Sequence, residues 1–444
     1  MLKLDKLNIL RMTIPIMLGT FIQNIISITD SILVNSLGME AFDAANNAGL
    51  LYIVFFMLSR GLGDGSQIQI AKEYGQSKFK EINHTLNNTF VLQFIISALL
   101  IAVLFLINGS LIDDFVKNDE IGEDMKIFLD YRSWGLFFAG FQVSILAFFT
   151  GIGQTKIIIV SSLFMVIINV FLDFGLIFGY FGLPEMGLAG AALASTIAEA
   201  LTFLFLLVYL LKSKLLIQFN FKPAARFIVY KSKLLLKLSW PLMLSGFLSI
   251  STWFVFFSFI EQRSAFELEV SHVVRNLFFI SFIPIFGFAT TTRTYVSYYY
   301  GRAEYQNVKL AQKNLLILSI GFYLLFFHGA IFYPETLVRI ITSSPEVVLE
   351  AASILQLVFG SMLLFSIVTI YQNSVAAVGK TVHVLFIEII SIVIYLLFAY
   401  YFTMVWQFNI FEVWTIEYPY FGITGILSVL YLYYFNKKNK LTNG

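Results

Sequence analysis

Three apolar segments of the sequence carry polar side chains at a similar predicted depth in a membrane. Measured from the basic ends of their segments, Asp30 and Asp173 lie about 28 Å and about 25 Å along a helix. Ser195 lies about 15 Å from the opposite end of a third segment. Asn169 precedes Asp173 by four residues, so these two side chains share one helical face. We expect the four residues to lie close together in the outer half of the membrane.

The chemistry of these four side chains predicts a site for a small cation. Two carboxylates, a carboxamide and a hydroxyl form an oxygen-rich set that suits a hard cation such as Na⁺. Two neighbouring carboxylates can equally share one proton. Hydrogen bonding between helices is the alternative role of these residues, and for Ser195 alone it is the better interpretation. For Asp30 and Asp173 we favour the cation site, because an uncompensated carboxylate in a membrane is costly. The choice between Na⁺ and H⁺ stays open at this stage.

Six more charged residues fall within apolar segments, and two of them are four residues apart. We interpret Arg60 and Asp64 chiefly as an ion pair within one helix, beside closely packed glycines. Glu199 lies four residues after Ser195 on the same face, where it could extend the carboxylate path or be structural, with equal weight.

The other three charged residues lie in the second half of the sequence, and we interpret each as structural. Glu388 and Arg293 are expected to extend toward the cytoplasmic ends of their segments. Arg275 lies near the outer end of its segment, where it could meet an anionic substrate. Accessory roles at the site are therefore considered for a short set of residues: Arg60, Asp64, Glu199, Arg275 and Glu388.

The composition is that of a polytopic membrane protein. Of 444 residues, 58% are hydrophobic and 13% are charged, and the mean hydropathy is +0.82; soluble domains average about 25% charged residues. A net charge of +2 gives no electrostatic footprint for nucleic acid. The absence of cysteine excludes disulfides and thiolate sites, and four scattered histidines do not predict a metal cluster.

Polar breaks divide the chain into twelve predicted membrane spans, which makes the expected fold all-α. The second and eighth are weakly hydrophobic and are accepted because the charge pattern requires them. The predicted spans are 8–36, 44–71, 89–108, 127–150, 157–181, 187–211, 234–260, 270–299, 313–333, 350–376, 382–404 and 421–435.

Charge sorting predicts the orientation of these spans. With both termini in the cytoplasm, 21 of the 29 basic residues lie on the inner side and only five lie on the outer side or its margins: Lys117, Lys126, Arg132, Arg263 and Arg339. The predicted organisation is an N-lobe of six spans at 1–211, a basic linker at 212–233, a C-lobe of six spans at 234–436 and a basic tail at 437–444.

The two halves repeat each other in sequence. Four motifs recur at one constant spacing, and a later motif recurs at a slightly larger one. Because each half has an even number of spans, we expect a pseudo-two-fold axis along the membrane normal, as in transporters that alternate access between two lobes. The matching pairs are Pro15 and Pro241, Gly61 and Gly287, Tyr74-Gly75 and Tyr300-Gly301, Gly153-x-Thr155 and Gly379-x-Thr381, and, at the larger spacing, Gly187-x-x-Gly190 and Gly422-x-x-Gly425.

Several first-half motifs resemble those of one transporter family over essentially the whole chain. They are Pro15, Ile28-Thr-Asp30-Ser, Gly151-Ile-Gly153-Gln-Thr-Lys156, Asn169-Val-Phe-Leu-Asp173-Phe-Gly-Leu-Ile-Phe-Gly179, and Pro184-Glu-Met-Gly187-Leu-Ala-Gly190-Ala-Ala-Leu-Ala-Ser195. This pattern resembles the multidrug and toxic compound extrusion (MATE) family of the MOP superfamily. The resemblance implies a V-shaped pair of six-helix lobes and cation-coupled export of organic compounds.

The resemblance also implies a cation site in the first half at Asp30, Asn169, Asp173 and Ser195, where relatives usually have Thr in place of Ser. The sequence departs from one branch of the family, since Ser249 stands where that branch has Glu and Lys380 where an Asp is frequent. The second half is therefore expected to lack that branch's cation site, which favours coupling through Asp30.

The predicted function is antiport in a multidrug efflux protein: export of cationic or amphiphilic organic compounds in exchange for Na⁺ or H⁺, with no cofactor. We expect a monomer in the plasma (inner) membrane, with a small-molecule substrate and lipid as its partners and no nucleic acid. A flippase or exporter of lipid-linked saccharides or of a specific metabolite is the alternative, supported by Arg275 and Arg293. An intramembrane enzyme is disfavoured because His272, His328 and His383 lie in different spans.

Overall fold

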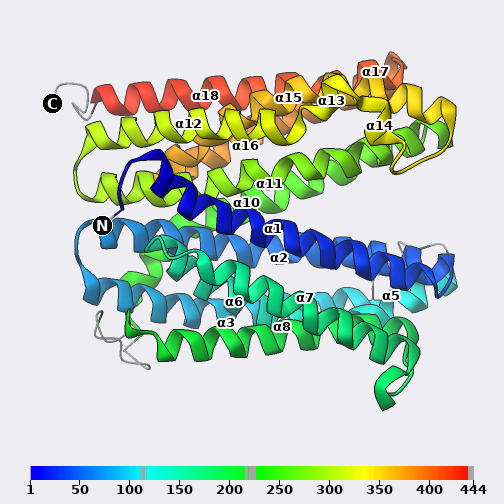
Figure 1. The fold of residues 1–444 in the computed structure, drawn as a ribbon, viewed down its shortest axis with the longest axis horizontal. Helices are drawn as coiled ribbons and strands as arrows, with labels where there is room; N and C mark the ends of the chain where they lie inside the picture. Colours follow the sequence, from blue (N-terminus) through cyan, green and yellow to red (C-terminus); the bar gives the residue numbers. More distant parts are fainter. Residues whose placement is uncertain are drawn as a thin grey trace. The chain divides into compact units, whose positions relative to one another are not determined.

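The computed structural model describes residues 2–110, 112, 116, 118–215, 219 and 227–438, and within them the chain is helical without strands (Figure 1). Ten helices of this part are long and apolar enough to cross a membrane. They are α1 (Lys6–Asn35), α2 (Met39–Gly75), α3 (Phe79–Ser110), α7 (Lys156–Phe178), α8 (Gly187–Lys212), α10 (Val229–Glu261), α11 (Ala265–Gly301), α12 (Tyr305–Phe327), α15 (Pro345–Ala377) and α16 (Thr381–Tyr400).

The span expected at 127–150 is not one straight helix. It consists of α5 (Asp119–Arg132) and α6 (Gly135–Gly151), which meet at an angle of 46°. Asn118 caps α5 by accepting hydrogen bonds from two backbone amides of the first turn, and two acidic residues there favour the helix dipole. The predicted span therefore begins within α5, a helix rich in charged residues, and continues through the apolar α6. Hydropathy did not predict the bend between them, because it carries no information on backbone direction.

The last helix, α18 (Glu417–Lys438), covers the position of the twelfth predicted span. It contains several tyrosines and a proline, and it is not among the ten helices named above. Short elements join the long ones: η1 (Tyr180–Gly182), α13 (Gly329–Phe332), α14 (Pro334–Val338), the π-helix η2 (Tyr401–Val405), α17 (Ile410–Val413) and η3 (Trp414–Ile416).

The backbone repeats at the spacing seen in the sequence. Helices α2 and α11 are each 37 residues long, and their first and last residues are separated by the same spacing as Pro15 and Pro241. Both are followed by a residue in the left-handed region, Ser77 and Ala303, each with φ of 58°. Gly153 and Gly379 likewise have φ of 78° and 80°. The turns between spans are thus built in the same way in both halves, as expected for a duplicated unit.

The chain forms two compact units, and the boundaries between them fall inside two long helices. One unit contains Met1–Met17 with Leu244–Gly444, and the other contains Leu18–Met243. The divisions fall within α1 and α10, two residues after Pro15 and Pro241. A proline inside a helix removes a backbone hydrogen bond and weakens the helix locally. Each boundary between the units therefore lies just after a locally weakened part of a helix.

The lobe boundaries at 1–211 and 234–436 remain a prediction, because the compact units divide the chain at different residues. Residues 216–218 and 220–226 of the predicted linker and residues 439–444 of the predicted tail lie outside the described residues.

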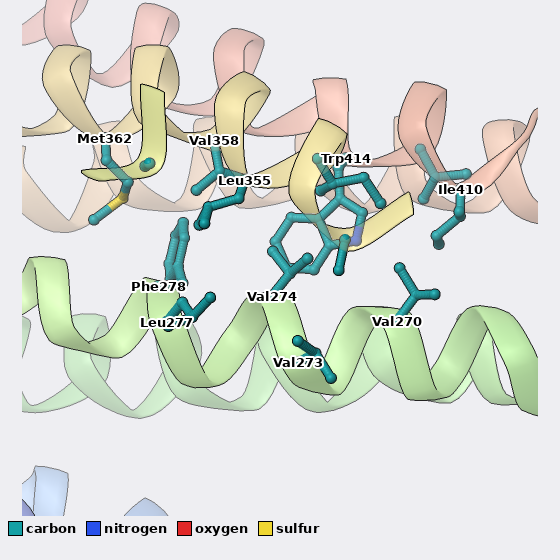
Figure 2. Close-up of a cluster of buried hydrophobic side chains, with 14 of the residues drawn as sticks. Val270, Val273, Val274, Leu277, Phe278, Leu355, Val358, Met362, Ile410 and Trp414 are labelled. Carbon is teal, nitrogen blue, oxygen red and sulfur yellow. The ribbon is translucent and has the colours of Figure 1, made fainter. Parts of the chain in front are cut away.

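In the unit that contains Leu244–Gly444, apolar side chains of α11 and α15 pack around Trp414. Figure 2 shows Phe278 and Val274 of α11 facing Leu355 and Val358 of α15, with Trp414 between the helices. The indole of Trp414 is fully buried, and its nitrogen donates a hydrogen bond of 3.2 Å to Ser271. A buried indole N–H without an acceptor would be costly. The hydrogen bond to Ser271 removes this cost for the largest side chain of this core.

In the other unit, the beginning of α10 is attached by a buried ion pair. The Lys231 ammonium lies 2.6 Å from a carboxylate oxygen of Glu73 and 2.6 Å from one of Glu81. Glu73 also accepts hydrogen bonds from Gln69 and Thr85. Only 3% of the Glu73 side chain is exposed. Its carboxylate is therefore stabilised by these partners and not by water.

Replacing Lys231 with Met should leave Glu73 buried without its cation and lower the stability of the protein by about 3–5 kcal/mol. The measurement is the unfolding temperature in detergent. Lys126→Met is the matched control, because Lys126 pairs with the exposed Glu123 and such pairs contribute about 0–1 kcal/mol. Equal unfolding temperatures for the two variants would contradict the prediction.

Candidate cation site

The four residues of the predicted site lie on three helices that approach each other closely. Asp30 is on α1, Asn169 and Asp173 are on α7, and Ser195 is on α8. A side chain at Gly190 would overlap the backbone carbonyl of Leu176, so α7 and α8 can pack at this distance only with glycine there.

Helix α1 approaches α7 in the same way. A methyl group at Gly19 would overlap the side chain of Ile158. Two glycines therefore allow the helices that carry the site to come into close contact. This close approach is needed because the side chains of Asp, Asn and Ser are short and reach only a few ångströms from their backbones.

Ser195 connects α8 with the other two helices. Its hydroxyl oxygen lies 3.3 Å from Oδ2 of Asp30, to which it donates, and it accepts a hydrogen bond of 3.4 Å from the amide of Asn169. The carboxyl group of Asp173 lies close enough to that of Asp30 for the two charges to act on each other. The structure thus brings together all four residues that depth and charge selected.

Several oxygens of this group accept no hydrogen bond within the described residues. They are Oδ1 of Asp30, Oδ1 of Asn169 and both carboxylate oxygens of Asp173. Buried polar atoms are nearly always paired in folded proteins, and these four are acceptors with no donor. A cation or a proton would satisfy them, and the oxygen-rich set fits Na⁺.

The burial of the four residues is uneven. Asn169 and Asp173 are 0% exposed, whereas Asp30 and Ser195 are partly exposed. The group is therefore closed on the side of α7 and reachable on the side of α1 and α8.

A second charged group is formed by residues of α2, α5 and α8, and sequence reasoning missed most of it. The guanidinium of Arg132 donates to both carboxylate oxygens of Glu199 at 2.7 and 2.6 Å, and it stacks 3.7 Å over the ring of Tyr52. The charge count had assigned Arg132 to an outer margin, but its side chain is 14% exposed. The sequence signal for its burial was its position just before an apolar segment.

The remaining accessory residues do not join the cation site. Arg60 and Asp64 both lie on α2, and their ion pair stays a prediction. Arg275 stacks 4.8 Å over the ring of Phe257. Arg293 donates to Asn373 at 2.8 Å and is buried.

Glu388 is buried among neutral hydrogen-bond donors, and its extension toward the cytoplasmic end of its helix stays a prediction. Its side chain is 4% exposed and accepts hydrogen bonds from Ser249 at 2.7 Å, Tyr420 at 2.6 Å and Gln372 at 2.8 Å. A carboxylate therefore does reach Ser249, but it comes from α16.

Comparison with known proteins gives a family assignment. The MatE family model matches residues 15–175 and 241–401, two segments separated by the spacing of the internal repeat. Together they cover more than half of the chain. The chain belongs to the MatE family.

Relatives and solved structures agree with the MatE assignment. A probable multidrug resistance protein NorM of Thermotoga maritima is 25% identical over 392 residues, covering 87% of this chain and 82% of that protein. A probable multidrug resistance protein YoeA of Bacillus subtilis is 21% identical over 389 residues, covering 85% and 82%. A crystal structure of MATE in complex with MaD5 superposes with a TM-score of 0.88 at 19% identity, covering 98% and 97%.

The MatE match and the structural likeness confirm the expected fold: an all-α, multi-pass membrane protein with twelve spans in two halves. Within the described residues these spans are the ten long helices, the bent pair α5–α6 and α18. As a MatE protein, the chain is a membrane transporter and not an enzyme.

The glycine contact beneath the site can be tested directly. Gly190→Ala should push α8 away from α7 and lower stability by about 1–3 kcal/mol, the usual cost of overpacking. The readout is the unfolding temperature in detergent. Gly321→Ala on α12 is the control, because no atom lies within 4 Å of the added methyl group and alanine favours a helix. An unfolding temperature for Gly190→Ala equal to or above that of the control would contradict the packing argument.

Proposed function

We propose that the protein is a secondary active transporter that exports organic compounds in exchange for Na⁺ or H⁺. The coupling site consists of Asp30, Asn169, Asp173 and Ser195. The single observation that carries this proposal is the group of four buried oxygens without donors around two carboxylates. The substrate class, cationic or amphiphilic organic molecules, is proposed from the relatives named as multidrug resistance proteins.

The coupling follows from the charge of the site. Without an ion, two neighbouring carboxylates repel each other, and the energy falls when a cation or proton enters. Binding on the outer side therefore neutralises the site and draws α1, α7 and α8 together around it. This rearrangement weakens substrate binding, so the exported molecule leaves as the ion enters. After reorientation the ion leaves to the cytoplasm and substrate binds again.

The donor set favours a monovalent ion. Within the described residues no three acidic, histidine or cysteine side chains gather as a metal site. Two carboxylates with neutral oxygens match Na⁺ or one proton, whereas Ca²⁺ takes six to eight oxygen ligands and Mg²⁺ demands an octahedral set. The orientation proposed with this mechanism has both termini in the cytoplasm and places the protein in the plasma membrane.

The alternative of a saccharide-lipid flippase depended on free cationic side chains in the second half. Arg293 is bonded to Asn373 and Arg275 is stacked on Phe257. Neither contact supports that alternative.

The coupling site is tested by export of a cationic dye. In vesicles that contain the purified protein, Asp30→Asn and Asp173→Asn should each reduce ion-driven ethidium export at least about fivefold, the lower range of coupling effects. Each substitution leaves a side chain of similar size but removes the charge that an ion neutralises. Ser195→Thr should retain export, because it keeps the hydroxyl.

Glu123→Gln is the matched control, since it also removes one carboxylate charge but at an exposed position. The assignment is wrong if either Asp variant exports the dye at the rate of this control at equal protein content.

A further inference from the structure

The Arg132–Glu199 pair forms a closed group with Tyr52. The carboxylate of Glu199 accepts two charge-assisted bonds from Arg132, and the hydroxyl of Tyr52 lies 3.1 Å from both carboxylate oxygens. Bidentate pairs of this kind are the strongest side-chain interactions of arginine. The stacking of the guanidinium over the Tyr52 ring fixes its plane as well. Arg132 therefore has its two terminal nitrogens and one face occupied.

The bend in the fourth span provides the space for this group. Arg132 is the last residue of α5, and Gly135 is the first residue of α6. A methyl group at Gly135 would overlap both the guanidinium of Arg132 and the carboxylate of Glu199. Gln142, further along α6, donates 2.7 Å to the backbone carbonyl of Glu199. Both sides of the bend thus hold the ion pair in place.

The pair lies within electrostatic reach of the cation site. Glu199 follows Ser195 by one helical turn on α8. The positive charge of Arg132 attracts Asp30, and the negative charge of Glu199 opposes that attraction. Together with Asp173, these charged groups act most strongly on Asp30.

A guanidinium within electrostatic reach of Asp30 is a potential competitor for the ion of the carboxylate pair. If Arg132 bonded to Asp30, it would neutralise the pair permanently and no ion would be required. The observed geometry directs Arg132 to Glu199 and leaves the oxygens of Asp30 and Asp173 without a basic hydrogen-bond partner in the described residues.

We propose that Glu199 and Tyr52 hold Arg132 away from Asp30, so that the carboxylate pair remains available to the coupling ion. Arg132 is thus an internal competitor, and Glu199 is a positioning residue that acts on the site through it. This inference rests on the proposed coupling role of Asp30 and Asp173.

The test compares the single variant Glu199→Gln with the double variant Arg132→Met, Glu199→Gln. Glu199→Gln removes the charge that holds Arg132, so the freed guanidinium should compete at Asp30. Arg132→Met with Glu199→Gln removes the competitor as well. If Glu199 acts through Arg132, the double variant regains ion binding, whereas a merely structural loss would persist or increase.

Ion binding is measured on the purified full-length protein in detergent, without substrate. The probes are Na⁺, with K⁺ as the reference at fixed pH, and a pH series in K⁺. At concentration c, a bound ion stabilises the folded protein by RT ln(1 + c/Kd), so the rise of the unfolding temperature with ion concentration gives the half-saturating concentration. The profile of Asp30→Asn is subtracted to remove ionisations outside the site.

We expect Glu199→Gln to raise the half-saturating Na⁺ concentration about tenfold or, if the ion is H⁺, to move the midpoint about one unit to lower pH. The double variant should return to within about threefold of the wild type. Gly135→Ala displaces the pair without changing any charge, and its ion affinity should fall in the same direction as that of Glu199→Gln.

The outcomes separate the two proposals. If Asp30→Asn keeps the ion dependence of the wild type, the coupling site is wrong and the role of Arg132 is overturned with it. If Asp30→Asn loses the ion dependence while Glu199→Gln retains it, only the role of Arg132 is wrong. Equal loss in Glu199→Gln and the double variant would also overturn that role, because the pair would then act only through folding.

Discussion

The cost of burying two neighbouring carboxylates without a basic hydrogen-bond partner is the constraint on which this structure depends. Asp30 and Asp173 lie on different helices, and three of their four carboxylate oxygens lack donors within the described residues. Such a group is stable only when a positive charge or a proton joins it. In the proposed mechanism the ion is therefore part of the energetics of the fold in this region, and its binding and release would change which arrangement of α1, α7 and α8 is most stable.

The rest of the first half can be understood from that requirement. Glycines at positions 19 and 190 allow three helices to approach closely enough for short polar side chains to meet. The bend between α5 and α6 brings in a guanidinium whose charge is balanced by Glu199. The second half uses the same backbone plan, as the equal lengths of α2 and α11 indicate. There the buried carboxylate Glu388 accepts three neutral hydrogen bonds instead.

The sequence predicted what hydropathy and spacing can encode. Span positions, the internal repeat and the meeting of Asp30, Asn169, Asp173 and Ser195 all followed from periodicity and depth. It did not predict the bend after Arg132, because hydropathy records how apolar a segment is and not the direction in which its backbone runs; α5 is in fact far more polar than α6. The pairing of Arg132 with Glu199 was missed for a related reason: residues 67 positions apart share no local pattern. The environment of Glu388 likewise depends on side chains from three other helices.

The most direct test of the account is the ion movement that accompanies export. Purified protein in liposomes would be supplied with a cationic dye, and internal Na⁺ and pH would be followed with separate fluorescent indicators. The account predicts that either Na⁺ or H⁺ moves opposite to the dye in the wild type and that this movement disappears in Asp173→Asn. Dye export by the wild type without movement of either ion, or an unchanged ion movement in Asp173→Asn, would contradict it.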